Sequence, residues 1–202
     1  MSDKIAAYTQ AVKEKLSPER FAHSLNVAET AKNLSIKYGY LSEHVNSFDV
    51  FAEKAFTAGL LHDIMKDIPK TEQLEIISGG GVALSALELA LPKLWHAIAG
   101  EIYARDFLFV RDSEILSAIR CHTTAKSGMT LLEKVLYIAD FISADRVYDG
   151  VGRMREKAAR DLDEAMEEGL AFSIEELIKK LFPIHPDTIS AYNEIIMPAR
   201  QS

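Results

Sequence analysis

Apolar residues recur at helical spacing along almost the whole chain, and this periodicity restricts the fold more than any other feature. Near the C-terminus they stand four positions apart, with charged residues between them, at Leu162, Met166, Leu170, Ile174 and Ile178. Such spacing places them on one face of a helix. Almost no segment alternates apolar and polar residues for long enough to form a strand. The chain is therefore predicted to be all-α, a helical bundle with short connections.

Start and stop signals divide this pattern into separate helices. Ser17 followed by Pro18 predicts a helix start, and Gly39 predicts its end. Ser113 and Thr130 are expected to cap two further helices. The expected helices span residues 18–38, 48–65, 71–77, 92–107, 113–121, 130–142 and 187–196. Because no linker or repeat separates them, residues 1–202 are expected to form a single domain, with a core at about 17–146 and C-terminal helices at about 153–197.

Charge and composition exclude several classes of protein. The chain has 23 Lys and Arg against 30 Asp and Glu, and a net charge of −7, without the basic stripe that a nucleic-acid backbone requires. The most apolar stretch, residues 82–100, is interrupted by charged residues and a proline, so it cannot cheaply cross a bilayer. With no export signal and one cysteine, Cys121, we expect a cytoplasmic protein without nucleic-acid or membrane partners. Its oligomeric state stays open, with a homodimer as one alternative.

Histidines and one His-Asp pair are the candidates for chemistry. His62 and Asp63 directly follow the apolar run 58–61, and burying both is costly unless something compensates them. A divalent metal does so, because imidazole and carboxylate are its common ligands. A helical bundle can bring further ligands to its core from separate helices. The candidates on other expected helices are His23, His96, His122 and Asp140.

Each histidine taken alone is more often an ordinary core or surface residue than a ligand. We keep that interpretation for His44, which lies in a polar loop, and for His185, which lies between prolines. The other histidines, His23, His62, His96 and His122, differ from these two because the order of the segments around them, and their sequence context, form a pattern.

That order resembles the HD-domain phosphohydrolases. The segments around His23, His62-Asp63, His122 and Asp140 follow one another as in that family. The likeness is closest to its YqeK-type branch, the bacterial symmetrical diadenosine tetraphosphatases, through residues 129–134, 148–151, 161–165 and 184–193. It covers about residues 20–193. Three departures stand out: Trp95 before His96, Ala125 where a glycine is usual, and Ser-Ala-Asp at 143–145 in place of a Glu-Pro before Arg146.

The resemblance implies a site for two metal ions. His23, His62, Asp63 and Asp140 would hold one ion, and Asp63 would bridge to a second ion held by His96 and His122. Histidine and carboxylate ligands admit iron, manganese, zinc, nickel or cobalt, and the resemblance favours iron. Two such ions meet both demands of phosphoanhydride hydrolysis, an activated water and stabilisation of phosphate charge.

Two residues after the His-Asp pair are further candidates for catalysis beside Asp63. Lys66 stands four positions after His62 and would share its face if the helix continues. It could then contact a substrate phosphate, or be a solvated lysine at a helix end. Asp67 has the same relation to Asp63, and could orient a ligand or donate a proton.

Substrate phosphates could be bound by Lys66 and by three other side chains. Arg20 lies three residues before His23, and Arg146 six after Asp140. Arginine suits bidentate contact with phosphate, although either residue could equally be a surface charge. Thr123, next to His122, could line the phosphate path or cap the next turn.

The function implied by the resemblance is metal-dependent hydrolysis of diadenosine tetraphosphate into two ADP. A second interpretation keeps the same site but changes the substrate to a nucleoside monophosphate or a guanosine alarmone. A third is a non-catalytic module that senses nucleotides. The intact set of metal ligands argues against the third.

Overall fold

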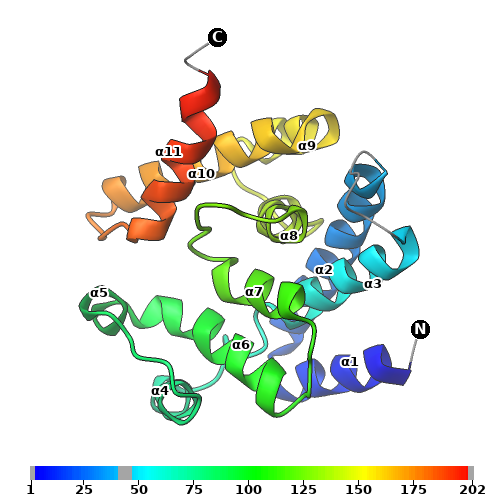
Figure 1. Ribbon diagram of the computed structural model, residues 1–202, viewed down its shortest axis with the longest axis vertical. Coiled ribbons are helices and arrows are strands. Elements are labelled where there is room, and N and C mark those ends of the chain that lie inside the picture. Colours follow the sequence, from blue (N-terminus) through cyan, green and yellow to red (C-terminus); the bar gives the residue numbers. More distant parts are fainter. Residues whose placement is uncertain (1–2, 41–46, 200–202) are drawn as a thin grey trace.

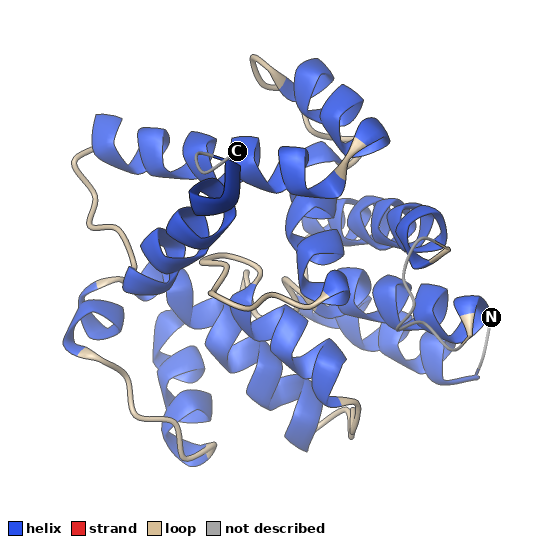
Figure 2. Cartoon of the chain, turned by 45° about the horizontal axis from the view of Figure 1, so that its top comes forward, coloured by secondary structure: helices blue, strands red, loops and turns tan. Residues whose placement is uncertain are grey.

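The computed structural model describes residues 3–40 and 47–199, and every regular element in those two segments is helical (Figure 1, Figure 2). The all-α prediction is confirmed. His44 lies outside the described residues, and none of the described helices is both long and apolar enough to cross a membrane.

The elements are α1 (Asp3–Lys15), α2 (Pro18–Gly39), α3 (Phe48–Leu61), α4 (Lys70–Gly79), α5 (Ala86–Ala90), the 3₁₀ turn η1 (Pro92–Leu94), α6 (Trp95–Asp106), α7 (Ser113–Cys121), α8 (Leu131–Ile142), α9 (Val151–Arg160), α10 (Leu162–Lys179) and α11 (Pro186–Ala199).

Helix α8 lies near the middle of the molecule, where Figure 1 shows it end-on. It is apolar on nearly all sides and most of its residues are buried, as expected of a core helix. Thr130 caps it as predicted: its side chain accepts a hydrogen bond from the Glu133 N–H, and the Glu133 carboxylate accepts one from the Thr130 N–H at 2.7 Å. This reciprocal cap fixes the start of the helix that carries Asp140 near its other end.

Helices α2 and α3 approach each other most closely at Gly59. A Cβ atom at Gly59 would lie 2.7 Å from Ala28 Cα and 2.9 Å from Ala28 N, closer than non-bonded atoms pack. Only glycine therefore permits this contact, although glycine weakens a helix by about 1 kcal/mol relative to alanine. The contact brings His23 in α2 beside His62 at the end of α3.

Helix α3 ends four residues earlier than predicted, at Leu61 instead of position 65. The chain then turns tightly, with the Ile64 N–H bonded to the Leu61 carbonyl at 3.1 Å and the Lys66 N–H to the Asp63 carbonyl at 2.8 Å. Periodicity alone does not reveal this change, because buried apolar residues continue through the turn.

Two helix caps differ from prediction, although both helices start where expected. Asp112, not Ser113, caps α7: its Oδ1 accepts hydrogen bonds from the N–H groups of Glu114 at 3.0 Å and Ile115 at 3.3 Å. Ser17 does stand at the N-cap of α2, but its side chain makes no capping hydrogen bond. Helices α1 and α5 were not anticipated, and both lack a strong apolar stripe: α1 buries only Ile5 and Val12.

Ala125 adopts a left-handed backbone conformation, with φ of 55°, in the turn that follows α7. Its N–H bonds to the Cys121 carbonyl at 2.8 Å, and its methyl group is fully buried. The left-handed conformation explains why glycine suits this position, since glycine adopts it without steric cost.

Candidate metal centre

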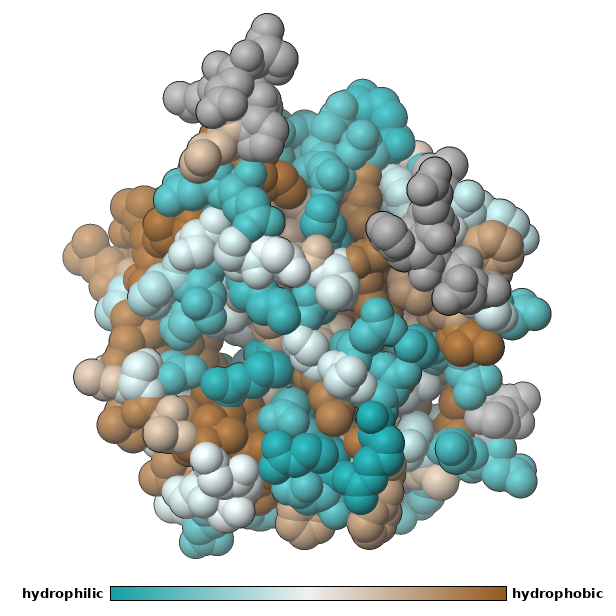
Figure 3. All heavy atoms as spheres, in the orientation of Figure 1, coloured by the Kyte–Doolittle hydropathy of each residue, from teal (hydrophilic) through white to brown (hydrophobic). Residues whose placement is uncertain are grey.

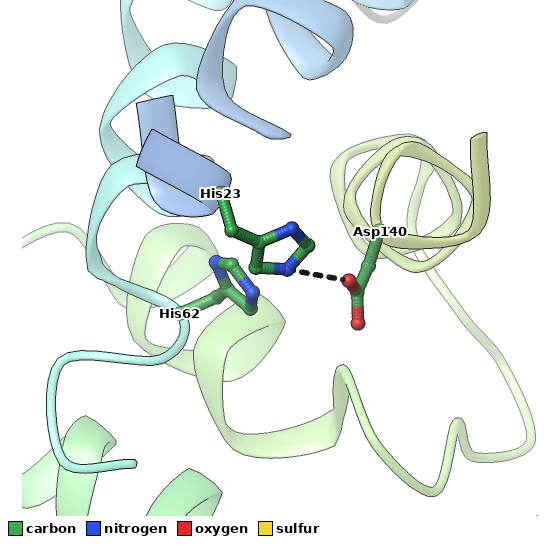
Figure 4. A group of neighbouring side chains, drawn as sticks. All are labelled: His23, His62 and Asp140. Carbon is green, nitrogen blue, oxygen red and sulfur yellow. Dashed lines mark ion pairs between the residues drawn. The ribbon is translucent and has the colours of Figure 1, made fainter. Parts of the chain in front are cut away.

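Three predicted ligands meet where α2, the end of α3 and α8 approach one another (Figure 4). One ligand atom each from His23, His62 and Asp140 lies within 4.8 Å of the others. His23 Nε2 is 3.1 Å from Asp140 Oδ1, as the dashed line in Figure 4 marks. These three side chains form the first ligand group.

A second ligand group surrounds Asp63. Its Oδ1 lies 3.2 Å from His96 Nε2 and 3.5 Å from His122 Nε2. His62 stands between the two groups, because its Nε2 is 3.7 Å from Asp63 Oδ2. The structure thus brings together all six predicted ligands, and Asp63 lies where one carboxylate can serve both groups.

The histidine rings are oriented by hydrogen bonds at Nδ1. The Nδ1 atoms of His62, His96 and His122 lie 2.6, 2.7 and 2.8 Å from the carbonyl oxygens three residues earlier, those of Gly59, Lys93 and Ile119. The carbonyls that bond His62 and His122 are free of intrahelical N–H partners, because α3 and α7 end there. A ring that donates from Nδ1 presents a lone pair at Nε2. In these three rings Nε2 is therefore the atom that could bind a metal ion.

His96 is brought into the site by the helix start that Trp95 stabilises. Trp95 is the first residue of α6 and is mostly buried. Its indole N–H donates to the Glu88 carbonyl at 2.8 Å, which holds α6 against α5. Trp95, which departs from the usual family pattern, therefore does not move His96 out of the site.

The buried polar atoms of the site fit a bound cation. Neither His62 Nε2 nor Asp63 Oδ1 has a hydrogen-bond donor, although both atoms are buried. The Nε2 atoms of His96 and His122 face each other at 3.2 Å, so their lone pairs oppose. Buried atoms without a donor, as at His62 Nε2 and Asp63 Oδ1, cost several kcal/mol in order of magnitude, whereas a divalent cation uses such lone pairs as ligands.

Four of the six candidate ligands are held in their metal-binding protonation states. Burial lowers the pKa of both His62 and His96 to about 4, so these rings are neutral at neutral pH. Burial raises the pKa of Asp63, but His62, His122, His96 and Lys66 outweigh it and bring the pKa well below its usual value. The pKa of Asp140 is lowered as well, because His23, His62 and Arg146 outweigh its burial.

Lys66 and Thr123 lie at the edge of the second group. Lys66 Nζ is 3.0 Å from His96 Nε2 and 3.4 Å from Asp63 Oδ1. The turn after α3 brings it there, not the helical continuation that the sequence suggested. Thr123 Oγ1 lies 3.1 Å from His122 Nε2 and 3.3 Å from His96 Nε2. Both side chains are therefore within reach of a ligand bound at this group.

Arg20 and Asp67 form an ion pair beside the same group. Arg20 Nε lies 2.6 Å from Asp67 Oδ1, and Arg20 Nη1 lies 3.7 Å from Asp63 Oδ2. The other oxygen of Asp67 accepts a hydrogen bond from the Ser17 N–H at 2.9 Å. Burial opposes ionisation of Asp67, but Ser17 and Arg20 lower its pKa below the usual value. An anion at neutral pH cannot donate a proton, so the geometry favours an orienting role for Asp67.

The loop between α8 and α9 contributes Arg146, which was predicted, and Asp145, which was not. The Arg146 guanidinium bonds the Asp140 carboxylate, and its Nε donates to the Asp140 carbonyl at 2.7 Å. Asp145 Oδ2 accepts from His23 Nδ1 at 2.7 Å and so orients that ring. The sequence 143–145, which differs from the usual family pattern, could have indicated Asp145, because it places an additional carboxylate beside the segment that contains Asp140.

Arg155 on α9 anchors this loop and was also missed. Its guanidinium donates to the carbonyls of Ile142 at 3.0 Å, Ser143 at 2.8 Å and Arg146 at 3.1 Å. No sequence motif points to these contacts, because they join a helix face to backbone atoms.

A cavity of about 510 Å³ opens beside the first ligand group. Thr123, Asp140 and Arg146 line the end nearest the ligands. The remaining wall is largely apolar and comes from η1 and Leu91, the turn after α7, α8, the 143–150 loop, α10, and the start of α11 with the turn before it. It includes Phe141, Tyr148, Phe172, Ser173, Leu177 and His185. Sequence reasoning missed this wall, although Phe172 lies off the four-residue apolar stripe of its helix and could have signalled a second apolar face.

Comparison with known proteins agrees with this arrangement. Residues 20–145 match the HD domain family. The chain is 36% identical over 185 residues to the symmetrical bis(5'-nucleosyl)-tetraphosphatase of Bacillus subtilis, which covers 92% of this chain and 94% of that protein. The enzyme of the same name from Halalkalibacterium halodurans is 35% identical over 190 residues, 93% and 95% of the two chains. A crystal structure from Clostridium acetobutylicum, described as a "predicted HD superfamily hydrolase involved in NAD metabolism", superposes with a TM-score of 0.86 at 34% identity over 96% of this chain and 97% of the other.

Proposed function

Because the chain belongs to the HD-domain family, we propose that it is a symmetrical dinucleoside tetraphosphatase, which hydrolyses diadenosine tetraphosphate to two ADP. The observation that carries the proposal is the junction of the two ligand groups at Asp63, next to a cavity large enough for a nucleotide. The similarity to symmetrical tetraphosphatases over almost the whole chain supports the choice of substrate.

We assign one divalent ion to His23, His62, Asp63 and Asp140, and a second to Asp63, His96 and His122. Iron is the metal we propose, with manganese, zinc, nickel and cobalt as alternatives that accept the same ligands. The ions supply Lewis acidity, which lowers the pKa of water and offsets charge on phosphate oxygens.

The charge of the site favours a polyphosphate. The ligand set contains only two carboxylates, so two divalent ions would keep an excess of positive charge there. Arg20, Lys66 and Arg146 add three cationic groups at its edge. A tetraphosphate bridge is an anion of matching size and charge, and guanidinium and ammonium groups bind phosphate by charge-assisted hydrogen bonds.

Cleavage at the central bridge gives two equal products. Water adds to one of the two inner phosphorus atoms, and the bond from that phosphorus to the central bridging oxygen breaks. One ADP leaves with the bridging oxygen, and the other carries the oxygen of water on its terminal phosphate. The leaving diphosphate needs no protein acid, because a terminal phosphate accepts its last proton with a pKa of about 6. This agrees with Asp67 being an anion.

The proposal is tested by the products formed from diadenosine tetraphosphate. We expect two ADP and no ATP or AMP by chromatography, with one labelled ADP in each pair when the reaction runs in ¹⁸O water. Asp63→Asn should lose both bound metal and turnover, while Asp106→Asn, a remote exposed aspartate, should retain both.

Two results would contradict the proposal in different ways. Formation of ATP plus AMP would overturn the symmetrical cleavage and leave the metal ligands as assigned. Rapid hydrolysis of a nucleoside monophosphate or a guanosine alarmone, with the tetraphosphate untouched, would transfer the site to another substrate.

A further inference from the structure

The two flanks of the metal centre are unlike each other. On the side of Asp140 and Arg146 lies the cavity, and three aromatic rings form part of its wall. The Phe172 ring is 5.1 Å from that of Tyr148 and 6.1 Å from that of Phe141, measured between centroids. The ring planes of these two pairs meet at 34° and 87°, so the rings form an angled apolar wall, and a single ring face of such a wall can stack a nucleic-acid base.

Apolar side chains are also exposed close to the cavity, beside charged ones that line it. At the end of α10, Ile178 and Leu181 are exposed and Phe182 is partly exposed, and Figure 3 shows apolar surface gathered at that end of the helix. Lys93 Nζ lies 3.9 Å from the centroid of the Phe182 ring, across the opening. Lys180 and Glu176 line this end of the cavity as well, so the entrance offers apolar contacts together with two ammonium groups and one carboxylate.

On the other side of the centre the flank is charged and open. Arg20, Lys66 and Asp67 are there, with side chains 40%, 31% and 29% exposed. Lys70 adds another cation, and burial together with the charges of Lys66 and Arg20 lowers its pKa. This flank suits phosphate oxygens, and none of these four side chains is an aromatic ring.

We infer that the protein recognises only one of the two nucleosides of its substrate. One adenosine enters the aromatic cavity, the phosphates cross the metal centre onto the charged flank, and the second nucleoside stays outside. A cavity of about 510 Å³ suits one nucleoside with its nearest phosphates, and not both halves of a dinucleoside tetraphosphate. This inference rests on the proposed function, because it names how the substrate of that reaction is bound.

One-sided recognition makes a quantitative prediction from symmetry. Diadenosine tetraphosphate can enter the cavity with either adenosine, so it has two equivalent productive orientations. A substrate in which one nucleoside carries a bulky fluorophore on its base keeps only one productive orientation. Its kcat/KM should therefore fall by about twofold only. A substrate blocked on both bases should lose about tenfold or more, because base stacking is lost in both orientations.

The substrate experiment separates the inference from the proposed function. Release of two ADP from the unmodified tetraphosphate tests the function alone. If that reaction proceeds and the singly blocked substrate is as poor as the doubly blocked one, both nucleosides are recognised and the inference is wrong. Equal rates for all three substrates would also overturn it, since the cavity would then read neither base.

Binding to the metal-free protein provides a second readout that does not depend on turnover. Calorimetry should find one ADP per chain, and Phe172→Ala should weaken ADP at least about fivefold while leaving pyrophosphate binding unchanged. Phe107→Ala, which removes an exposed ring stacked on Tyr103 instead, is the matched control. Circular dichroism and unfolding temperature confirm that the variants are folded. Two equivalent ADP sites, or equal ADP affinity in Phe172→Ala, would refute one-sided recognition.

Discussion

Replacing Gly59 by alanine should damage the metal centre from a distance, through the packing of α2 on α3. The new Cβ would lie 2.7 Å from Ala28 Cα, and ordinary contact begins near 3.4 Å. The two helices must therefore separate by about 0.7 Å at this point. His23 and His62 move with them, and metal–ligand distances tolerate only about 0.2 Å of error. We expect the first ligand group to lose most of its affinity for a divalent ion.

The stability change follows from two opposing terms. Overpacking costs roughly 1–3 kcal/mol, and the better helix propensity of alanine returns about 1 kcal/mol. The net loss of about 0–2 kcal/mol corresponds to a fall in Tm of up to roughly 8 °C for a chain of this size. The variant should also have a shifted His62 ring, because the Gly59 carbonyl holds its Nδ1.

Gly100→Ala is the matched control. Gly100 is a buried helical glycine near the same site, but a Cβ there meets nothing closer than Ile119 Cγ2 at 3.6 Å. It should raise Tm by a few degrees through helix propensity alone and leave metal content unchanged. Calorimetric unfolding and elemental analysis of the purified variants measure both quantities. If Gly59→Ala binds metal like the parent protein and melts at or above Gly100→Ala, the close contact does not position the ligands.

Two further predictions concern the ligands themselves. Asp145→Ala removes the acceptor at His23 Nδ1 and should weaken metal binding about 10–100-fold in titrations. Asp145→Asn keeps an acceptor there and should restore much of the affinity. Equal affinity in the parent protein and both variants would exclude an orienting role for Asp145. Stability of the metal-free protein should fall as pH drops from about 6.5 to about 4, because burial lowers the pKa of His62 and His96 and the unfolded chain alone takes up those protons. Urea midpoints measured across that window check the sign, and a flat profile would contradict it.

The sequence predicts well those features that depend on local chemistry. Residue periodicity predicts the all-α fold, and the Thr130 cap follows from its own tetrapeptide with Glu133. The ordered His and Asp segments named the six side chains that the structure brings together. These features need only the residue types and their spacing.

Features that depend on tertiary contacts were not predictable in this way. The end of α3 at Leu61 has no glycine or proline directly after it to mark it, and the buried residues Ile64 and Met65 continue the apolar spacing through the turn. Asp145 and Arg155 act on partners far away in the sequence or on backbone carbonyls. The aromatic wall around Phe172 joins α8, α10 and the loop between α8 and α9, and only their packing reveals it.

The positions of His62 and His122, directly after the last residues of α3 and α7, have an electrostatic consequence. The aligned peptide dipoles of a helix leave roughly half a negative charge at its C-terminal end. Two such ends therefore point partial negative charge at the metal centre without a side chain that can be protonated. This part of the attraction for cations persists at any pH at which the helices are folded. It also vanishes if their last turns fray, so cation binding should protect the final amides of α3 and α7 from hydrogen exchange.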